Sequence, residues 1–270
     1  MQQIIRHIKK YRAKDLSAFS DSFLKKSIDQ RILETFSNNL AGYFSFINST
    51  PNEIDKLLDS LHISYSLFFR NPVDFSIIER YIFPGLIQKS SVSGKSIRIW
   101  STACAEGQEA YSIAMLADDL LQNYYGNIRT MILATDISEL VLTKARKGEF
   151  PACAIKNVKF SFINKYFENK GNTFLISDHI RGNVEFNHYD LLDSNTSSPP
   201  SGIFGGYDVV ICSNLLIYYK PEIQKTILKK LYNSISAGGY LLVDESEKSI
   251  VKFFDGFRLY SLLGNIFVKN

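Results

Sequence analysis

The amino-acid sequence predicts an α/β protein with a mostly parallel sheet that helices cover on both faces. From residue 96 onward, short apolar runs alternate with amphipathic helical segments, and a helical region precedes them. Such alternation is typical of parallel sheets, because each crossover lays a helix on the sheet. The 270 residues are 45% hydrophobic, with 20 Phe and 15 Tyr, which is enough for a substantial core.

The first 75 residues read as helical. Four apolar residues share one face of the first segment: Ile4, Ile5, Ile8 and Tyr11. Two later stretches, 50–53 and 71–74, each combine a polar residue, a proline and an acid that can reach back to the first amide, as helix starts do. We therefore expect a helical domain over 1–75 and a second domain over 76–270.

The second domain follows a strand, loop, helix rhythm. The expected strands are 96–101, 131–135, 184–189, 208–212 and 240–243. The expected helices are 109–121, 137–146 and 221–235. Residues 150–183 break the rhythm, and their aromatic segments 159–162 and 173–176 predict a small antiparallel insertion. A loop is expected over 195–206, and a closing hairpin from 257–260 and 265–268.

Composition and charge restrict the cellular compartment and the kinds of partner that we expect. The net charge of +4 does not indicate nucleic acid, and three Cys without CxxC spacing and four His give no metal signature. No stretch approaches the ~20 apolar residues of a membrane span, and no secretory signal is evident. We expect a cytoplasmic monomer without metal. Residues 1–14 carry five Lys or Arg and no acid, so they form either a solvated face or a docking surface for an acidic partner.

Several polar residues fall at strand ends, where open α/β sheets bind ligands. Asp136 could accept both hydroxyls of a ribose or cap the next helix, and Asn214 could bind a polar group or form a turn. The loop at Gly107 lacks the GxGxxG and GxxxxGK[ST] phosphate fingerprints, which a phosphate-free cofactor would not need. Arg70 could grip a carboxylate or lie on the surface, and Tyr218 could belong to the core.

Six ordered motifs together carry a resemblance. They are FFRNPVDF (68–75), STACAEGQEAYSIAM (101–115), ATDIS (134–138), VEFNHYDLLD (184–193), CSNLLIYY (212–219) and AGGYLLVDESE (237–247). In this order, over about residues 1–247, the chain resembles the CheR-type family, S-adenosylmethionine-dependent methyltransferases of glutamate side chains in chemotaxis receptors. The resemblance implies a Rossmann-like methyltransferase sheet, a helical N-terminal domain and a β-subdomain at 150–183.

The resemblance also implies site residues. Cofactor contacts carry over to Ser64, Ser66, Arg70, Gly107, Glu109, Asp136, Asp190, Leu191, Asn214 and Leu215. The implied partner is the cytoplasmic region of a chemoreceptor or related signalling protein, with S-adenosylhomocysteine as the product. A glutamate carboxylate is already ionised at neutral pH and needs no general base, so catalysis is mostly alignment. Arg70 and Tyr218 are the candidate catalytic donors to that carboxylate.

The chain departs from the family pattern at several positions. Ser213 replaces an Arg, Ala110 a Pro, Ala105-Glu106 a Ser-Thr pair, Asp190 an Asn, and 243–245 a small stretch containing Gly. These departures keep open a methyltransferase of RNA or a small molecule, or a degenerate CheR-like module that binds without activity. No [ND]PP[YF] motif follows Ile211, which disfavours an adenine or glutamine substrate, and a dehydrogenase lacks its glycine fingerprint.

Overall fold

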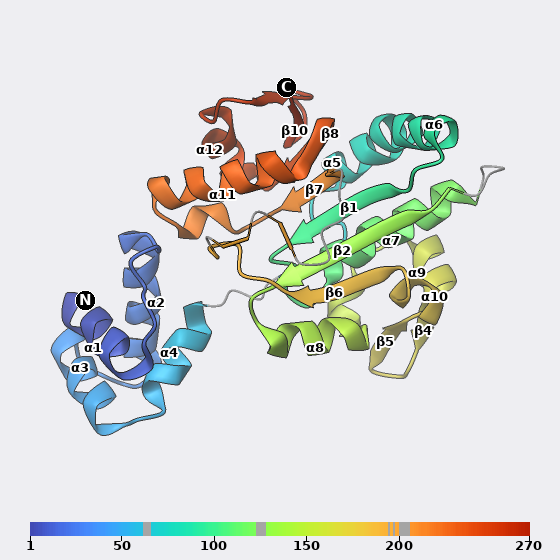
Figure 1. Ribbon diagram of the computed structural model, residues 1–270. Helices are drawn as coiled ribbons and strands as arrows, with labels where there is room; N and C mark the ends of the chain where they lie inside the picture. Colours follow the sequence, from blue (N-terminus) through green and yellow to red (C-terminus); the bar gives the residue numbers. More distant parts are fainter. Residues whose placement is uncertain (62–65, 123–127, 194, 197, 200–205) are drawn as a thin grey trace. The chain divides into compact units, whose positions relative to one another are not determined.

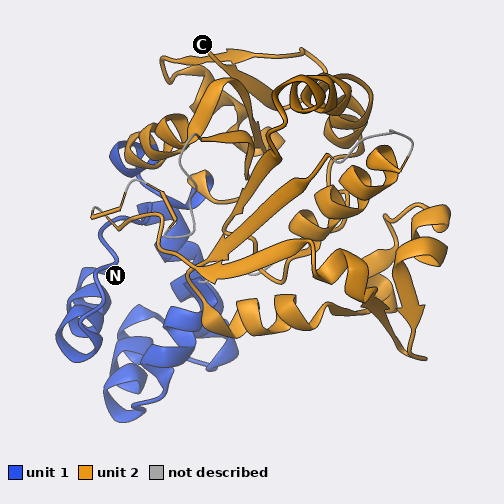
Figure 2. Cartoon of the chain, turned by 45° about the vertical axis from the view of Figure 1, so that its right-hand side comes forward, with its two compact units in different colours: residues 1–63, 217–224 blue, residues 64–216, 225–270 orange. Residues whose placement is uncertain are grey.

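The chain divides into two compact units (Figures 1 and 2). The computed structural model describes residues 1–61, 66–122, 128–193, 195–196, 198–199 and 206–270. Unit 1 comprises Met1–Ile63 and Ile217–Gln224, and unit 2 comprises Ser64–Leu216 and Lys225–Asn270. The expected domain boundary was residue 75, and residues 64–75 belong to unit 2. Within the described residues, no helix has the length and apolar character needed to cross a membrane.

Unit 1 is helical, as the sequence predicts. Its helices are α1 (Gln2–Arg12), α2 (Asp21–Glu34), α3 (Leu40–Ser49) and α4 (Glu53–Leu61). Their apolar faces form one core, whose buried members include Ile4, Ile8, Phe23, Leu24, Ile28, Tyr43, Ile47, Ile54, Leu57 and Leu61. Ser20 caps α2 and Asn39 caps α3, each accepting from a backbone N–H of the first turn.

The acids of the two expected capping signals bind elsewhere. Glu53 accepts hydrogen bonds from Arg31 at 2.8 Å and from the Tyr43 hydroxyl at 2.9 Å. Asp74 accepts from the backbone N–H and side-chain amide of Asn265 at 2.7 and 3.1 Å. The capping prediction was therefore wrong for these acids, since both are buried and serve tertiary contacts that short-range spacing cannot reveal.

The basic N-terminal helix is partly neutralised within unit 1. Lys9 pairs with Asp15 at 2.7 Å, and Arg12 binds both carboxylate oxygens of Asp55 at 2.7 and 2.9 Å. Arg12 thus ties α1 to the first turn of α4. Docking of this helix to an acidic partner stays a prediction.

Unit 2 is built on a seven-stranded sheet in the order β6-β2-β1-β7-β8-β10-β9. The strands are β1 (Ile97–Thr102), β2 (Thr130–Asp136), β6 (Val184–His188), β7 (Tyr207–Cys212), β8 (Ile235–Val243), β9 (Phe257–Leu259) and β10 (Ile266–Lys269). Neighbours from β6 to β8 run parallel, and β10 is antiparallel to both β8 and β9. The predicted parallel sheet and closing hairpin are confirmed.

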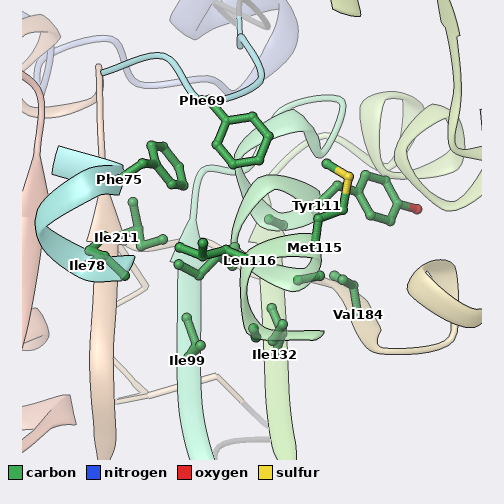
Figure 3. Close-up of a cluster of buried hydrophobic side chains, with 14 of the residues drawn as sticks. Phe69, Phe75, Ile78, Ile99, Tyr111, Met115, Leu116, Ile132, Val184 and Ile211 are labelled. Carbon is green, nitrogen blue, oxygen red and sulfur yellow. The ribbon is translucent and has the colours of Figure 1, made fainter. Parts of the chain in front are cut away.

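Helices connect these strands and cover the sheet (Figure 1). The crossovers are α7 (Gln108–Leu121), α8 (Glu139–Lys147) and α11 (Pro221–Ser234). Before β1 lie α5 (Pro72–Ile77), a π-helical turn (Ile78–Ile82) and α6 (Phe83–Ser93), and α12 (Lys248–Lys252) follows β8. Figure 3 shows Tyr111, Met115 and Leu116 of α7 beside Ile99 of β1 and Ile132 of β2 in the buried core.

A small antiparallel sheet is inserted after α8. It consists of β3 (Glu149–Pro151), β5 (Thr173–Ile176) and β4 (Phe167–Asn169), in that spatial order. The predicted insertion is confirmed, and segment 173–176 is its middle strand. Residues 160–162, by contrast, open α9 (Phe160–Tyr166). A 3-10 turn (Ala152–Ile155) and α10 (Asp178–Arg181) complete the insertion.

Candidate functional site

The strand order of unit 2 reverses between β1 and β7. From β1 the chain proceeds to β2 and β6 on one side, and then returns to β7 and β8 on the other. In open α/β sheets, ligands bind beyond the carboxyl ends of the strands at such a reversal. The loops that follow Thr102, Asp136 and Cys212 therefore define the candidate site.

The loop between β1 and α7 has an unusual backbone. Ala103, Ala105 and Gly107 have φ of 47°, 50° and 90°, in the left-handed region. A Cβ at Gly107 would lie 3.0 Å from the ring of Phe186, so glycine is required there. For alanine this conformation costs about 1–3 kcal/mol, and such strain clusters at functional sites. The loop therefore has a shape that the surrounding structure enforces.

Asp136 holds this loop in place. Its carboxylate accepts from the backbone N–H groups of Ala105 at 3.0 Å and Ser138 at 2.9 Å. Helix α8 begins at Glu139, so Asp136 supports the turn before the helix rather than a helix that starts at Ile137. A carboxylate has about four acceptor positions, which leaves capacity for ligand hydroxyls beside these two bonds.

Glu109 lies in the first turn of α7, close to other charged groups. The Ser101 hydroxyl donates to it at 3.2 Å. Burial raises the pKa of Glu109 to about 7, while hydrogen bonds from Ser213 and Ser101 and the charge of Arg70 oppose the rise. The negative charge of Glu247 acts in the same direction as burial. At neutral pH this carboxyl can therefore exist in either protonation state.

Glu247 organises the loop after β7. It is fully buried and accepts from the backbone N–H groups of Asn214, Leu215 and Leu216 at 2.9, 2.7 and 2.7 Å. The Asp244 N–H adds a bond at 3.1 Å. Burial raises the pKa of Glu247, and the four N–H groups oppose the rise. Glu247 was not among the predicted site residues, although it ends the motif AGGYLLVDESE (237–247).

Asn214 carries a buried acceptor that the described part of the chain does not satisfy. Its φ is 57°, and within the described residues its buried Oδ1 atom has no hydrogen-bond partner. Buried polar atoms are nearly always paired, so this oxygen fits a ligand that brings its own donor. On the neighbouring loop, Asp190 accepts from the Leu192 N–H at 2.8 Å, and Leu191 is buried.

Arg70 follows a kinked aromatic pair. Phe68 packs edge-on against Phe150 and Phe167 of the small sheet, with ring centroids 4.9 and 5.6 Å away. Phe69 has a φ of 47°, and its N–H donates to the Ser112 hydroxyl at 3.0 Å. These anchors fix the backbone that leads into Arg70. The Arg70 Nε atom lies 3.2 Å from Asp244 Oδ2, which directly follows β8, so the guanidinium lies near the carboxyl ends of the strands.

The remaining predicted residues lie in different parts of the chain. Ser66 is half-buried in unit 2, whereas Ser64 lies outside the described residues. Tyr218 belongs to unit 1, where its ring centroid lies 4.7 Å from that of Phe23 and its carbonyl accepts from the Ser20 N–H. Unit 2 by itself thus brings together Arg70, Glu109 and the loops at 136 and 214. Among the described residues, no group of His, Cys, Asp or Glu could hold a metal ion.

The fold and the residues at the carboxyl ends of its strands define the class of protein. It is a doubly wound α/β protein with a ligand site at the strand reversal. The family described as CheR methyltransferase, SAM binding domain, matches residues 64–261. The chain belongs to this family and is an S-adenosylmethionine-dependent methyltransferase.

Curated relatives agree with this assignment. The chain is 32% identical over 197 residues to Chemotaxis protein methyltransferase Cher2 of Pseudomonas putida, covering 72% of this chain and 69% of that protein. It is 33% identical over 197 residues to Chemotaxis protein methyltransferase 1 of Pseudomonas aeruginosa, with the same coverage. A chemotaxis protein methyltransferase of Listeria monocytogenes is 28% identical over 234 residues, which is 87% of this chain and 84% of that protein.

Proposed function

We propose that this protein transfers the methyl group of S-adenosylmethionine to glutamate side-chain carboxylates of a chemoreceptor or related signalling protein. The names of the relatives support the receptor substrate, and they do not favour RNA or a small molecule. The single observation that carries the proposal is Arg70, a cation whose Nε atom lies 3.2 Å from Asp244 Oδ2 directly after the carboxyl end of β8. Its guanidinium matches the geometry of an acceptor carboxylate.

The cofactor would be held by the loops at the strand reversal. Asp136 has acceptor capacity for the ribose hydroxyls, and Asn214 Oδ1, which has no partner among the described residues, suits a donor of the cofactor. Ionised Glu109 would attract the cationic amino-acid end. The other proposed contacts are Ser64, which lies outside the described residues, and Ser66, Arg70, Gly107, Asp190, Leu191 and Leu215. When bound, the cofactor supplies a methyl group on a cationic sulfur.

The protein's own contribution is to orient and desolvate the acceptor. A glutamate carboxylate with a pKa of about 4.3 is ionised at neutral pH, so no residue has to remove a proton. Arg70 would bind this carboxylate and offset part of its desolvation, and Tyr218 would donate a second hydrogen bond. Holding the carboxylate in line with the methyl group supplies most of the rate.

The test combines substrate identity with the two donors. Tritiated S-adenosylmethionine is incubated with the protein and membranes of its own host, and base-labile label on a receptor-sized band is the expected result. Arg70→Ala and Tyr218→Phe should slow the initial rate about 10²–10³-fold while changing cofactor affinity much less.

Two exposed residues provide matched controls, Arg80→Ala and Tyr81→Phe, which should keep the wild-type rate. Stable label on RNA would refute the receptor substrate. Tight cofactor binding without transfer to any protein would favour a binding module. Wild-type rates in both Arg70→Ala and Tyr218→Phe would refute the catalytic pair.

A further inference from the structure

We propose that Asp244 is a positioning residue for Arg70, and that it holds the guanidinium in the orientation that receives the acceptor carboxylate. This inference rests on the proposed role of Arg70. The Arg70 Nε atom lies 3.2 Å from Asp244 Oδ2, and the two side chains are 28% and 19% exposed. A carboxylate oxygen at Nε restricts rotation of the guanidinium at the end of its flexible side chain.

The two oxygens of Asp244 have separate tasks. Oδ2 forms the ion pair with Arg70, whereas Oδ1 accepts from the backbone N–H and hydroxyl of Ser246 at 3.1 and 2.9 Å. The second task caps the 3-10 turn Glu245–Glu247 directly after β8. Asp244 is therefore held by its own turn, independently of Arg70.

That turn also supports the loop at Asn214. The Asp244 N–H donates to Glu247, and Glu247 in turn accepts from the backbone of residues 214–216. Arg70 and the loop at residues 214–216 thus both contact the turn that follows β8, although they lie far apart in the sequence. Methyl transfer depends on alignment, and a misplacement of about 1 Å can cost about 100-fold in rate. A device that fixes Arg70 relative to this loop therefore acts on the rate.

If the Arg70–Asp244 pair served only to stabilise the fold, breaking it would lower the melting temperature. The positioning role predicts a loss of rate instead. A single ion pair near the surface contributes little to stability, because solvent screens it and ordering the side chains costs entropy. Breaking the pair should leave the melting temperature nearly unchanged. A loss of rate without a loss of stability would distinguish positioning from simple support.

Two substitutions separate the tasks of Asp244. Asp244→Ser keeps a side chain that caps helical turns but is too short to reach Arg70. Asp244→Asn has only one side-chain oxygen, so with the cap kept at Oδ1 it turns an amide NH₂ donor toward the Arg70 Nε–H. With host membranes and tritiated S-adenosylmethionine, we expect Asp244→Ser to lower kcat about 10-fold, with KM for the cofactor and the Kd of S-adenosylhomocysteine within about threefold. Asp244→Asn should lower kcat by a similar factor, because its amide nitrogen cannot accept from Arg70.

The double variant and a control complete the experiment. Adding Asp244→Ser to Arg70→Ala should cost no further rate, because the positioned group is already gone. Ser246→Ala, which removes only a contact to Oδ1, should keep the wild-type rate. A melting curve accompanies each variant, and Asp244→Thr replaces Asp244→Ser if the latter does not fold.

The outcomes distinguish this inference from the proposed function. If Arg70→Ala keeps the wild-type rate, the role of Arg70 fails and the inference fails with it. If Arg70→Ala is slow but Asp244→Ser is not, only the inference is overturned. A faster Asp244→Ser would mean that Asp244 competes with the acceptor carboxylate for Arg70, which also overturns it.

Discussion

Replacing Glu247 by glutamine should disrupt the loop after β7 without changing the volume of the side chain. The Oε1 atom, which accepts from Leu215 and Leu216, can be retained as the amide oxygen. The Oε2 atom, which accepts from Asn214 and Asp244, becomes an amide nitrogen. Two backbone N–H groups would then face another donor instead of an acceptor.

The expected loss of stability follows from the backbone N–H groups of Asn214 and Asp244. Each buried N–H left without an acceptor costs about 1–3 kcal/mol. Burial raises the pKa of Glu247, which means that burying its charge is unfavourable. Removing the charge therefore recovers part of the lost stability. We expect unit 2 to lose about 2–4 kcal/mol, which corresponds to a fall in melting temperature of roughly 5–15 °C for a domain of this size. Cofactor affinity should fall with it, because Asn214 loses its anchor.

The same turn offers a matched control. Glu245 lies two residues earlier with its side chain 72% exposed and 3.8 Å from Lys248. Glu245→Gln makes the same chemical change at the surface and should leave melting and affinity unaltered. Calorimetric melting and titration with S-adenosylhomocysteine measure both quantities. Equal melting temperatures and affinities for the two variants would refute the assignment of Glu247 as the anchor of this loop.

Three further outcomes follow from the described contacts. Asp136→Ala should weaken S-adenosylhomocysteine binding by roughly 1.5–3 kcal/mol in a calorimetric titration, and unchanged affinity in a folded variant would remove Asp136 from the site. Because the pKa of Glu109 is raised from 4.5 to about 7, the cofactor-free protein should lose stability as pH rises through that window. Cofactor affinity should instead rise between pH 6 and 8, and Glu109→Gln should abolish both trends. Glu53→Ala should destabilise unit 1 by about 3–5 kcal/mol because Arg31 loses a partner that is 1% exposed, whereas Glu34→Ala, which removes the exposed partner of Arg31, should barely change the melting curve.

The fold was predictable because its signals are local. Continuous apolar runs such as Val209–Ile211 become central strands, and Pro221 and the glycines after residue 236 bound a helix that the structure reproduces almost to the residue. The same locality explains which polar residues were found. Asp136 and Asn214 directly follow predicted strands, so topology alone brings them to one edge of the sheet.

The prediction failed where a side chain's partner is distant in the sequence. Glu53 and Asp74 each sit at a capping position, but Arg31 and Asn265 bind them instead. Glu247 belongs to the same class, because its partners at 214–216 become visible only once β7 and β8 are paired. Whether a carboxylate caps a helix or binds a distant group is decided by tertiary packing, which spacing does not encode.

The division of the chain has a consequence for engineering. Unit 1 is discontinuous in sequence, because residues 217–224 join the N-terminal helices through the bridge between Phe19 and Tyr219 and the bond from the Lys220 N–H to the Ala18 carbonyl. A chimera that exchanges residues 1–63 with those of a relative would therefore replace one partner in each of these two contacts and keep the other partner. The graft has to carry the second segment too, and that segment begins one residue after the backbone that Glu247 holds. Unit 1 and the methyltransferase sheet of unit 2 thus cannot be recombined at a single crossover point in the gene.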